Sequence, residues 1–155
     1  MNKEWFCEQI REYELSMYRY ALGSLKNTAD AEDAVSETVL KAYIHLEDLR
    51  KPDRFKPWIM SILANEIRTM LSRGSRIELT EDMSGYERSV PGEDRELWRL
   101  VTALLEEFRD VVILYYYEGF RSREIADILE IPEGTVKSRL SRARKQLKKM
   151  LEEKI

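Results

Sequence analysis

The sequence predicts an all-α protein made of two small helical domains joined by a flexible linker. Apolar residues recur every three or four positions through most of the chain, which is the spacing of one face of an α-helix. Glycine and proline, which interrupt helices, number only six and four among 155 residues. A stretch rich in Gly, Ser, Pro and acidic residues separates two periodic regions and predicts the linker. The predicted parts are residues 1–73, the linker over residues 74–95, and residues 96–155.

The charge of the chain is unevenly distributed. The net charge of −3 divides into −1 for residues 1–73, −6 for residues 74–120 and +4 for residues 121–155. A basic end can bind nucleic acid even when the whole chain is acidic. One cysteine and one histidine exclude a disulfide within the chain and give little support to a zinc site or a Cys–His nucleophile. We therefore expect no cofactor and no metal.

The sequence gives no sign of a membrane segment. The longest apolar run, Val111 to Tyr117, is far shorter than the roughly 20 residues that span a bilayer. The first residues are followed by no apolar core of the kind found in a signal peptide. We expect a cytoplasmic protein without direct membrane insertion.

Three helices are predicted in the front domain. The first runs from Glu4 to Leu25 and the second from Ala29 to Leu49, with Thr28 or Asp30 as its cap. A polar loop follows, and Arg54 to Ser72 form the third. The predicted inward residues of the first and third helices are Phe6, Ile10, Tyr13, Met17, Tyr20, Ala21, Phe55, Ile59, Ile62, Leu63, Ile67 and Leu71. These helices predict a three-helix bundle.

The second helix carries two apolar stripes. The first contains Val35, Val39, Ala42, Leu46 and Leu49. The second contains Leu40, Tyr43 and Ile44, and Glu32, Ser36 and Glu37 extend its polar end. A small bundle needs one stripe for its core, so the second fits either burial in the bundle or contact with a partner protein. Periodicity does not decide between the two.

One face of the third helix has a composition suited to unpaired bases. Trp58, Ser61, Asn65 and Arg68 recur at spacings of three and four. Aromatic, amide and guanidinium groups side by side can hold a base by stacking and hydrogen bonding. Trp58 also fits an ordinary core position, whereas Asn65 has low helix propensity in mid-helix and so calls for another explanation.

Two further helices, Leu97 to Leu105 and Phe108 to Tyr117, are predicted to begin the rear domain, with Gly119 as a stop. Their predicted core residues are Leu97, Leu100, Val101, Leu104, Phe108, Val111, Val112 and Tyr115.

The end of the chain has the pattern of a helix-turn-helix. A short helix over Ser122 to Leu129 is followed by a break at residues 131–134 and then by a helix that continues toward the chain end. Between Glu133 and Lys149, seven basic residues and one acidic residue give a local charge of +6. An apolar stripe of Val136, Leu140, Ala143, Leu147 and Met150 leaves the basic residues and two serines on other faces. The candidate DNA-binding residues are Lys137, Ser138, Ser141, Arg142, Arg144 and Lys145.

Two motif blocks carry a resemblance to a known family. The front block is Ala31-Glu32-Asp33-Ala34-Val35 and Phe55-Lys56-Pro57-Trp58-Ile59, and the rear block is Tyr117-Glu118-Gly119-Phe120, Glu124-Ile125-Ala126 and Pro132-Glu133-Gly134-Thr135-Val136-Lys137-Ser138-Arg139-Leu140. With both blocks in this order, the chain resembles the extracytoplasmic-function (ECF) sigma factors of the bacterial sigma-70 family over nearly its whole length. The rear block alone is similar to other bacterial regulators as well.

The resemblance implies a role for each domain in transcription initiation. The residues implied in docking on the clamp helices of core RNA polymerase are Glu32, Asp33, Ser36, Glu37 and Leu40. Those implied in binding the single-stranded minus-ten promoter element are Leu49, Arg50, Arg54, Ser61, Asn65 and Arg68. The rear helix would read the duplex minus-thirty-five element, and the linker would thread through polymerase. The family also implies an anti-sigma partner, and it implies neither catalysis nor a small-molecule substrate.

Three positions depart from the family pattern. Ser36 stands where glutamine is frequent, Arg121 where a capping hydroxyl is usual, and Leu105 where a proline often opens the rear domain. We therefore expect an altered docking contact at Ser36 and a helix that begins at Ser122. Two other functions stay open. A free-standing helix-turn-helix regulator would need a dimer, for which no long heptad repeat is visible, and an enzyme would need a second acidic group facing Asp30, Glu32 and Asp33.

Overall fold

The computed structural model describes residues 1–74 and 95–153, and these residues form helices without a β-strand. The chain divides into two compact units, Met1–Ser89 and Val90–Ile155. The predicted all-α class is confirmed. The predicted linker over residues 74–95 lies outside the described residues except at its two ends. No helix in the described ranges is long and apolar enough to cross a membrane.

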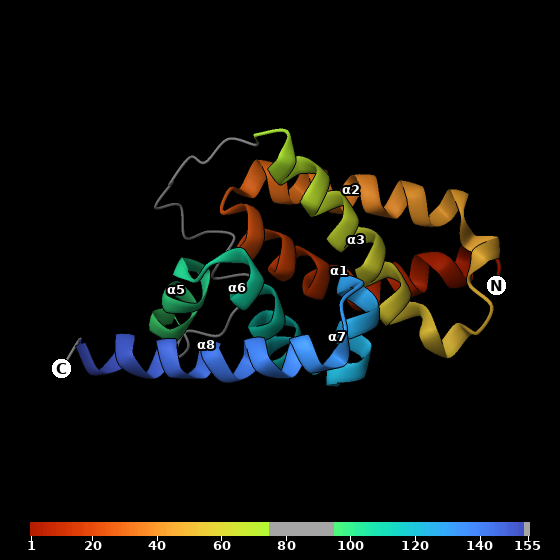
Figure 1. Cartoon of the computed structure of the whole chain (residues 1–155). Coiled ribbons are helices and arrows are strands. Elements are labelled where there is room, and N and C mark those ends of the chain that lie inside the picture. The colour runs from red at the N-terminus through yellow and green to blue at the C-terminus, as the bar shows by residue number, and fades with distance from the viewer. Residues whose placement is uncertain (75–94, 154–155) are drawn as a thin grey trace. The chain divides into compact units, whose positions relative to one another are not determined.

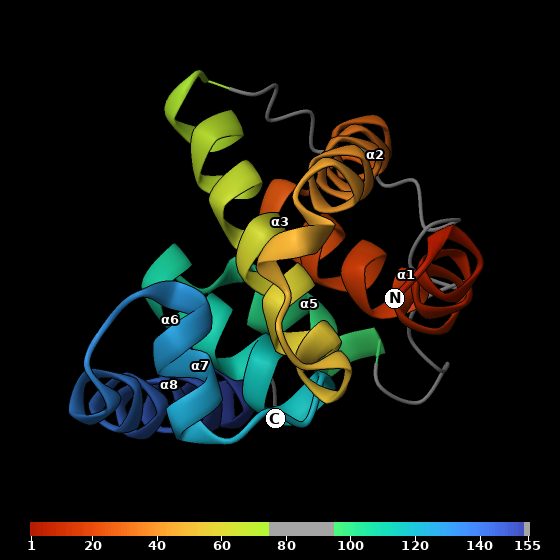
Figure 2. The same ribbon diagram turned by 90° about the vertical axis from the view of Figure 1, so that its right-hand side faces the viewer.

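The front unit is the predicted three-helix bundle. Among the described residues its α-helices are α1 (Lys3–Leu25), α2 (Thr28–Ile44) and α3 (Phe55–Ser72), and each packs against the other two (Figures 1 and 2). Phe55 lies at the centre of an aromatic cluster, with ring centroids 5.5–6.0 Å from those of Trp5, Phe6, Tyr13 and Trp58. Burying one such side chain contributes about 1.5–3 kcal/mol, so this cluster anchors the start of α3.

The turn between α1 and α2 depends on two residues. Lys26 adopts the left-handed conformation with φ 58°, and its N–H donates to the Leu22 carbonyl, which ends α1. Asn27 then begins the next helix, because its Oδ1 accepts a hydrogen bond of 3.0 Å from the Asp30 N–H. The predicted caps, Thr28 and Asp30, are therefore wrong, and Asn27 is the cap.

The second predicted helix is shorter than its periodicity suggested. It ends at Ile44 rather than Leu49, and two 3₁₀ turns follow, η1 (Leu46–Asp48) and η2 (Pro52–Arg54). Leu49 is extended with ψ 110° and 4% exposed, so it turns into the core instead of continuing the helix. Pro52 favours an extended residue before it, which Lys51 is. As a result, α3 begins at Phe55 and not at Arg54.

The described residues of the rear unit form four helices and one wide turn. These are α5 (Arg95–Ala103), α6 (Glu106–Val112), the π-helical turn η4 (Ile113–Tyr117), α7 (Ser122–Leu129) and α8 (Glu133–Glu153). Within this unit α8 contacts α5, α6 and α7 (Figure 1). The predicted helix Phe108 to Tyr117 is thus two segments, and the π turn widens the backbone where three tyrosines follow one another.

One predicted core residue of this unit is wrong. Leu97 is 38% exposed, whereas Trp98 and Val101 are buried at 4% and 1%. The ring of Trp98 packs edge-on against that of Tyr117 at 5.0 Å between centroids. This contact fixes which side of α5 faces inward and so turns Leu97 toward water.

The helix-turn-helix is formed as predicted. The helix α7 begins at Ser122, and Glu124 Oε1 accepts a hydrogen bond of 3.0 Å from the Arg121 N–H. Glu130 ends this helix in the left-handed conformation with φ 57°. Pro132 then precedes α8, whose Val136, Leu140 and Ala143 are buried at 0–2% exposure.

Candidate functional site

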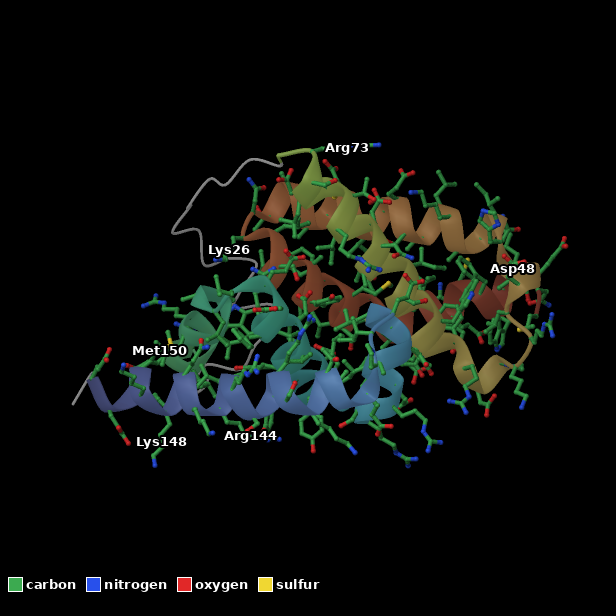
Figure 3. All side chains as sticks on the ribbon, viewed as in Figure 1. Lys26, Asp48, Arg73, Arg144, Lys148 and Met150 are labelled. Carbon is green, nitrogen blue, oxygen red and sulfur yellow. The ribbon has the colours of Figure 1, made fainter. Side chains whose placement is uncertain are left out.

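The outward face of α8 is basic and carries small hydroxyl side chains. The predicted residues Lys137, Ser138, Ser141, Arg142 and Lys145 are all exposed. They lie away from the buried stripe of Val136, Leu140 and Ala143, so the helix presents them together. In Figure 3, Lys148 extends from one side of α8 and the half-buried Met150 lies on the other. An α-helix with this face fits the major groove of duplex DNA.

The basic side chains of this face form only weak, exposed ion pairs. Lys137 Nζ lies 3.6 Å from Glu133 Oε1, and Lys148 Nζ lies 4.0 Å from Glu152 Oε1. All four side chains are at least 43% exposed, and exposed pairs of this kind contribute little, about 0.2–1 kcal/mol. A phosphate could therefore replace the carboxylate at either lysine.

Arg144 differs from the other predicted DNA-binding residues. Its Nε donates a hydrogen bond of 2.5 Å to the Tyr116 hydroxyl, and its guanidinium carbon lies 5.8 Å from the centroid of that ring. In Figure 3, Arg144 lies on α8, and Lys148 follows it one helical turn toward the C-terminus. Sequence reasoning missed Tyr116, because 28 residues separate it from its partner and no periodic pattern links them.

Of the three predicted minus-ten residues of α3, only Asn65 lines a cavity. A cavity of about 350 Å³ is lined by Lys41, His45, Asp48, Trp58, Ile62, Asn65, Glu66 and Thr69. Asn65 is exposed, and its Oδ1 accepts a hydrogen bond from Arg68 Nη2, which leaves the amide nitrogen able to donate to a base. Ser61 is not among the lining residues, and its hydroxyl donates instead to the Trp58 carbonyl at 2.6 Å.

The loop before α3 supplies two of its three predicted residues to the surface. Arg50 and Arg54 are exposed, but the Leu49 side chain is only 4% exposed. Leu49 is therefore not available to contact DNA with its side chain. It holds the loop against the core, and this positions the two arginines on either side of Pro52.

The outward face of α2 joins acidic and apolar residues. All five predicted polymerase-docking residues, Glu32, Asp33, Ser36, Glu37 and Leu40, are exposed. Leu40, Tyr43 and Ile44 at the end of the helix are 55%, 44% and 64% exposed. Of the two expectations for the second apolar stripe, burial in the bundle is therefore wrong, and contact with a partner stays a prediction.

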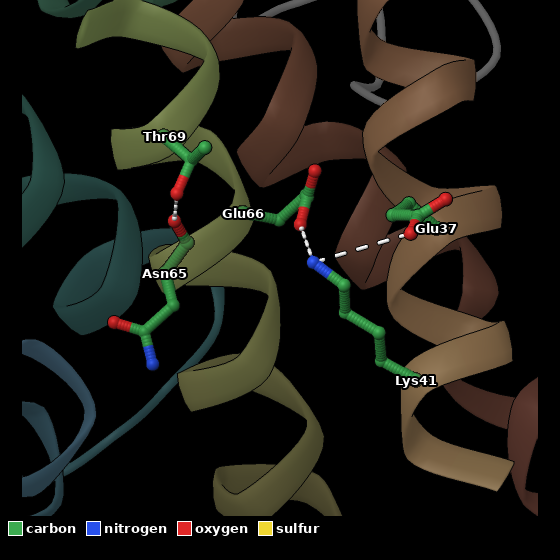
Figure 4. A network of polar contacts seen from close by, with 5 residues as sticks. All are labelled: Glu37, Lys41, Asn65, Glu66 and Thr69. Atoms are coloured by element: carbon green, nitrogen blue, oxygen red, sulfur yellow. Dashed lines mark hydrogen bonds and ion pairs between the residues drawn. The ribbon is translucent and has the colours of Figure 1, made fainter. Parts of the chain in front are cut away.

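A polar network ties this helix to α3 (Figure 4). Lys41 Nζ lies 2.5 Å from Glu66 Oε2 and 4.0 Å from Glu37 Oε1. The hydrogen bond to Glu66 raises the pKa of the Lys41 ammonium above its ordinary value. On the same turn of α3, the Thr69 hydroxyl donates to the Asn65 carbonyl at 3.0 Å. Sequence reasoning missed this link, because opposite charges 25 residues apart give no local signal.

The two units match two parts of one protein family. Residues 9–77 match the family described as Sigma-70 region 2, and residues 94–147 match Sigma-70, region 4. The ECF RNA polymerase sigma factor SigL of Mycobacterium tuberculosis is 37% identical over 92% of this chain and 86% of its own length. The chain belongs to the ECF sigma factors.

Other relatives of this sigma factor support the assignment. SigV of Bacillus subtilis, an RNA polymerase sigma factor, is 30% identical over 90% of the chain and 86% of its own length. The probable RNA polymerase sigma factor RfaY of Xanthomonas campestris is 31% identical over 80% of the chain, but the chain spans only 34% of that protein.

Two solved structures share the fold. CnrH in complex with the cytosolic domain of CnrY has a TM-score of 0.76 at 24% identity and covers 97% of the chain and 90% of its own. The sigma factor RpoE of Bartonella quintana, in complex with the anti-sigma factor NepR, has a TM-score of 0.72 at 26% identity and covers 94% and 97%.

Proposed function

We propose that this sigma factor binds core RNA polymerase and selects promoters by reading a duplex minus-thirty-five element and a single-stranded minus-ten element. The observation that carries the proposal is the outward face of α8, with exposed Arg142 between Ser138, Ser141 and Lys145. Arginine can bind guanine through two hydrogen bonds, and small serines let the helix approach the bases closely. Lysines on the same face would neutralise phosphates, which adds affinity but no sequence preference.

The minus-ten element would be held by the front unit. The cavity beside Trp58 and Asn65 is large enough for one base, and it combines an aromatic ring with an amide. Exposed Arg50 and Arg54 supply positive charge for the strand on either side. A base that leaves the duplex for this cavity gains stacking of about 1–3 kcal/mol, which offsets part of the cost of strand separation.

The outward face of α2 would dock on the clamp helices of polymerase. Apolar Leu40 and Ile44 would be buried, while Glu32 and Glu37 would meet basic groups of the enzyme. Ser36 has a shorter side chain than the glutamine frequent in the family, so its contact would be reduced. An anti-sigma factor that covers the same face would block docking, and the solved complexes of CnrH and RpoE motivate this part of the proposal.

Reconstitution with core polymerase tests the proposal. The sigma factor and bacterial core polymerase are combined with a library of promoter fragments, and specific transcripts are sequenced. We expect transcripts from fragments that share two short elements at a fixed spacing, with poor binding by the sigma factor alone, because two weak contacts cooperate only when polymerase fixes their separation. A chain that fails to associate with polymerase but binds a duplex tightly by itself would instead be a free-standing regulator.

A further inference from the structure

The contact between Tyr116 and Arg144 joins the π turn η4 to the DNA-facing helix α8. Two features define it: a hydrogen bond of 2.5 Å from Arg144 Nε to the tyrosine hydroxyl, and a guanidinium carbon 5.8 Å from the ring centroid. Tyr116 is 53% exposed, so the contact lies on the surface of the rear unit. An arginine side chain has many rotamers, and two contacts to one ring restrict them.

The position of Arg144 on α8 differs from that of the base-reading candidates. Each residue turns an α-helix by about 100°, so Arg144 lies only about 40° around the axis from buried Leu140. Arg142 lies about 160° from Leu140, near the middle of the outward face. When a helix enters the major groove, its outward middle approaches the base edges, and its flanks approach the phosphates of the groove walls. The flank position therefore favours a phosphate as the ligand of Arg144.

The donors of the guanidinium lead to the same ligand. The hydrogen bond to Tyr116 uses the Nε–H of Arg144. The two terminal nitrogens, with four N–H donors, form the end of the side chain that is directed at a ligand. Two terminal nitrogens that are pre-set in direction suit the oxygens of one phosphate. The tyrosine also withdraws Arg144 from the outward face, so it keeps this charge from competing with Arg142 for a base.

We propose that Tyr116 is a positioning residue that holds Arg144 on the flank of α8. There the Arg144 guanidinium binds a backbone phosphate of the duplex minus-thirty-five element, which is the upstream element of the promoter. This inference rests on the proposed function of α8 and adds a division of labour within it. Arg142 supplies sequence preference, and the Tyr116–Arg144 pair supplies affinity and register without preference.

The test measures binding of the holoenzyme to a fluorescent duplex that carries only the upstream element, across a series of KCl concentrations. The variants are Tyr116→Ala, Tyr116→Phe, Arg144→Ala and Tyr116→Ala with Arg144→Ala. Arg142→Ala is the matched control on the same helix. Loss of one phosphate contact should reduce the steepness of the plot of log affinity against log salt, its salt slope, by about 0.9. It should also weaken binding to all duplex sequences alike, by roughly three- to tenfold for Arg144→Ala.

The expected pattern distinguishes positioning from simple structural support. Tyr116→Ala should lower the salt slope in the same direction as Arg144→Ala, Tyr116→Phe should have a smaller effect, and the double variant should be no weaker than Arg144→Ala alone, because both act on one contact. An unchanged salt slope in Tyr116→Ala, with only a lower melting temperature, would overturn the inference. A change of base preference in Arg144→Ala would overturn the assignment of a phosphate ligand.

Failure of the inference is separable from failure of the proposed function. If the wild-type holoenzyme prefers the upstream element and Arg142→Ala loses that preference, the function stands whatever the Tyr116 variants do. If the wild-type holoenzyme shows no preference among duplexes, α8 does not read the promoter, and the inference is overturned together with the function.

Discussion

Arg142 is the residue on which sequence preference is expected to depend. It is exposed near the middle of the outward face of α8, between Ser141 and buried Ala143. Replacing it with alanine should reduce the discrimination among upstream elements by about 1–3 kcal/mol, because one bidentate contact to a base edge is lost. Binding of the holoenzyme to a set of single-base variants of the element measures this loss.

Lys148 provides the comparison for Arg142. It lies further along α8, exposed and paired only with Glu152 at 4.0 Å. Lys148→Ala should weaken all duplexes alike and lower the salt slope by about 0.9. If Lys148→Ala and Arg142→Ala gave the same profile across sequences, the assignment of the reading face would be wrong.

Asn65 should act at strand separation and not at duplex binding. Asn65→Ala removes the amide that lines the cavity beside Trp58 and also removes the Oδ1 that accepts a hydrogen bond from Arg68. We expect slower formation of open complexes, measured by permanganate reactivity of unpaired thymines, with nearly unchanged binding to the upstream duplex. Ser72→Ala is the control, because Ser72 is exposed on the same helix outside the cavity. Equal losses in both assays would count against base capture.

Residue-scale prediction from sequence succeeded for the exposed face of α8 and failed where tertiary packing decides burial, as at Leu97. The periodicity of α8 placed Lys137, Ser141 and Arg142 on one exposed face correctly, because helix geometry alone decides it. Arg109 is only 5% exposed, with its Nε 3.8 Å from Asp110 Oδ1, although arginine is seldom buried. Tertiary packing decides such burial, and the local sequence carries no sign of it.

At the scale of elements, a residue in the left-handed conformation lies on each side of α7, and only one of the two is a glycine. Gly119, with φ +73°, precedes the helix, and Glu130, with φ 57°, ends it. Gly119→Ala should lower the free energy of unfolding by about 1 kcal/mol or more, because a Cβ disfavours this conformation. Glu130→Gly should raise it relative to Glu130→Ala by about 1 kcal/mol, since both lose the side chain and only glycine relieves the backbone. Urea denaturation of the full chain measures both, and the same sign at the two positions would contradict the explanation.

The link between α2 and α3 should depend on pH. Glu66→Gln removes the acceptor of Lys41 and should lower the free energy of unfolding by about 0.5–1 kcal/mol near neutral pH. The bond raises the pKa of Lys41, so its stabilisation is full below the ordinary lysine pKa of about 10.4 and is lost as pH rises through the folded-state value. The difference between wild type and variant should therefore disappear in strongly alkaline buffer.

Glu37→Gln is the control for this link. Its carboxylate lies 4.0 Å from the same ammonium on an exposed surface, so its effect should be smaller. A larger effect for Glu37→Gln than for Glu66→Gln would show that the link between the helices is not the stabilising contact.

Helices were easier to predict than their ends. The apolar spacing identified every long helix of the described residues, but it extended α2 by five residues and missed the π turn. The end of α2 is set by the burial of Leu49 and the constraint from Pro52, both of which act against helix propensity. The wide turn η4 keeps an apolar sequence, so periodicity cannot distinguish it from an α-helix.

At the scale of the whole molecule, two motif blocks were enough to predict the family and the all-α class. Each block forms part of its own compact unit, and each matches one sigma-70 region. The site residues follow partly from helix geometry and partly from the family. The cavity beside Asn65 could not be predicted, because it depends on where η1 and α3 meet. In the proposed function, polymerase sets the distance between the two DNA contacts, so this distance cannot be predicted from the sequence of the chain alone.

The exposed apolar residues at the end of α2 also have a consequence for copies of the chain that are not bound to a partner. Leu40, Tyr43 and Ile44 are all exposed at this end, and an exposed apolar patch is prone to aggregation where no partner covers it. Copies made in excess of polymerase are therefore expected to aggregate, which limits how much of the free chain can accumulate.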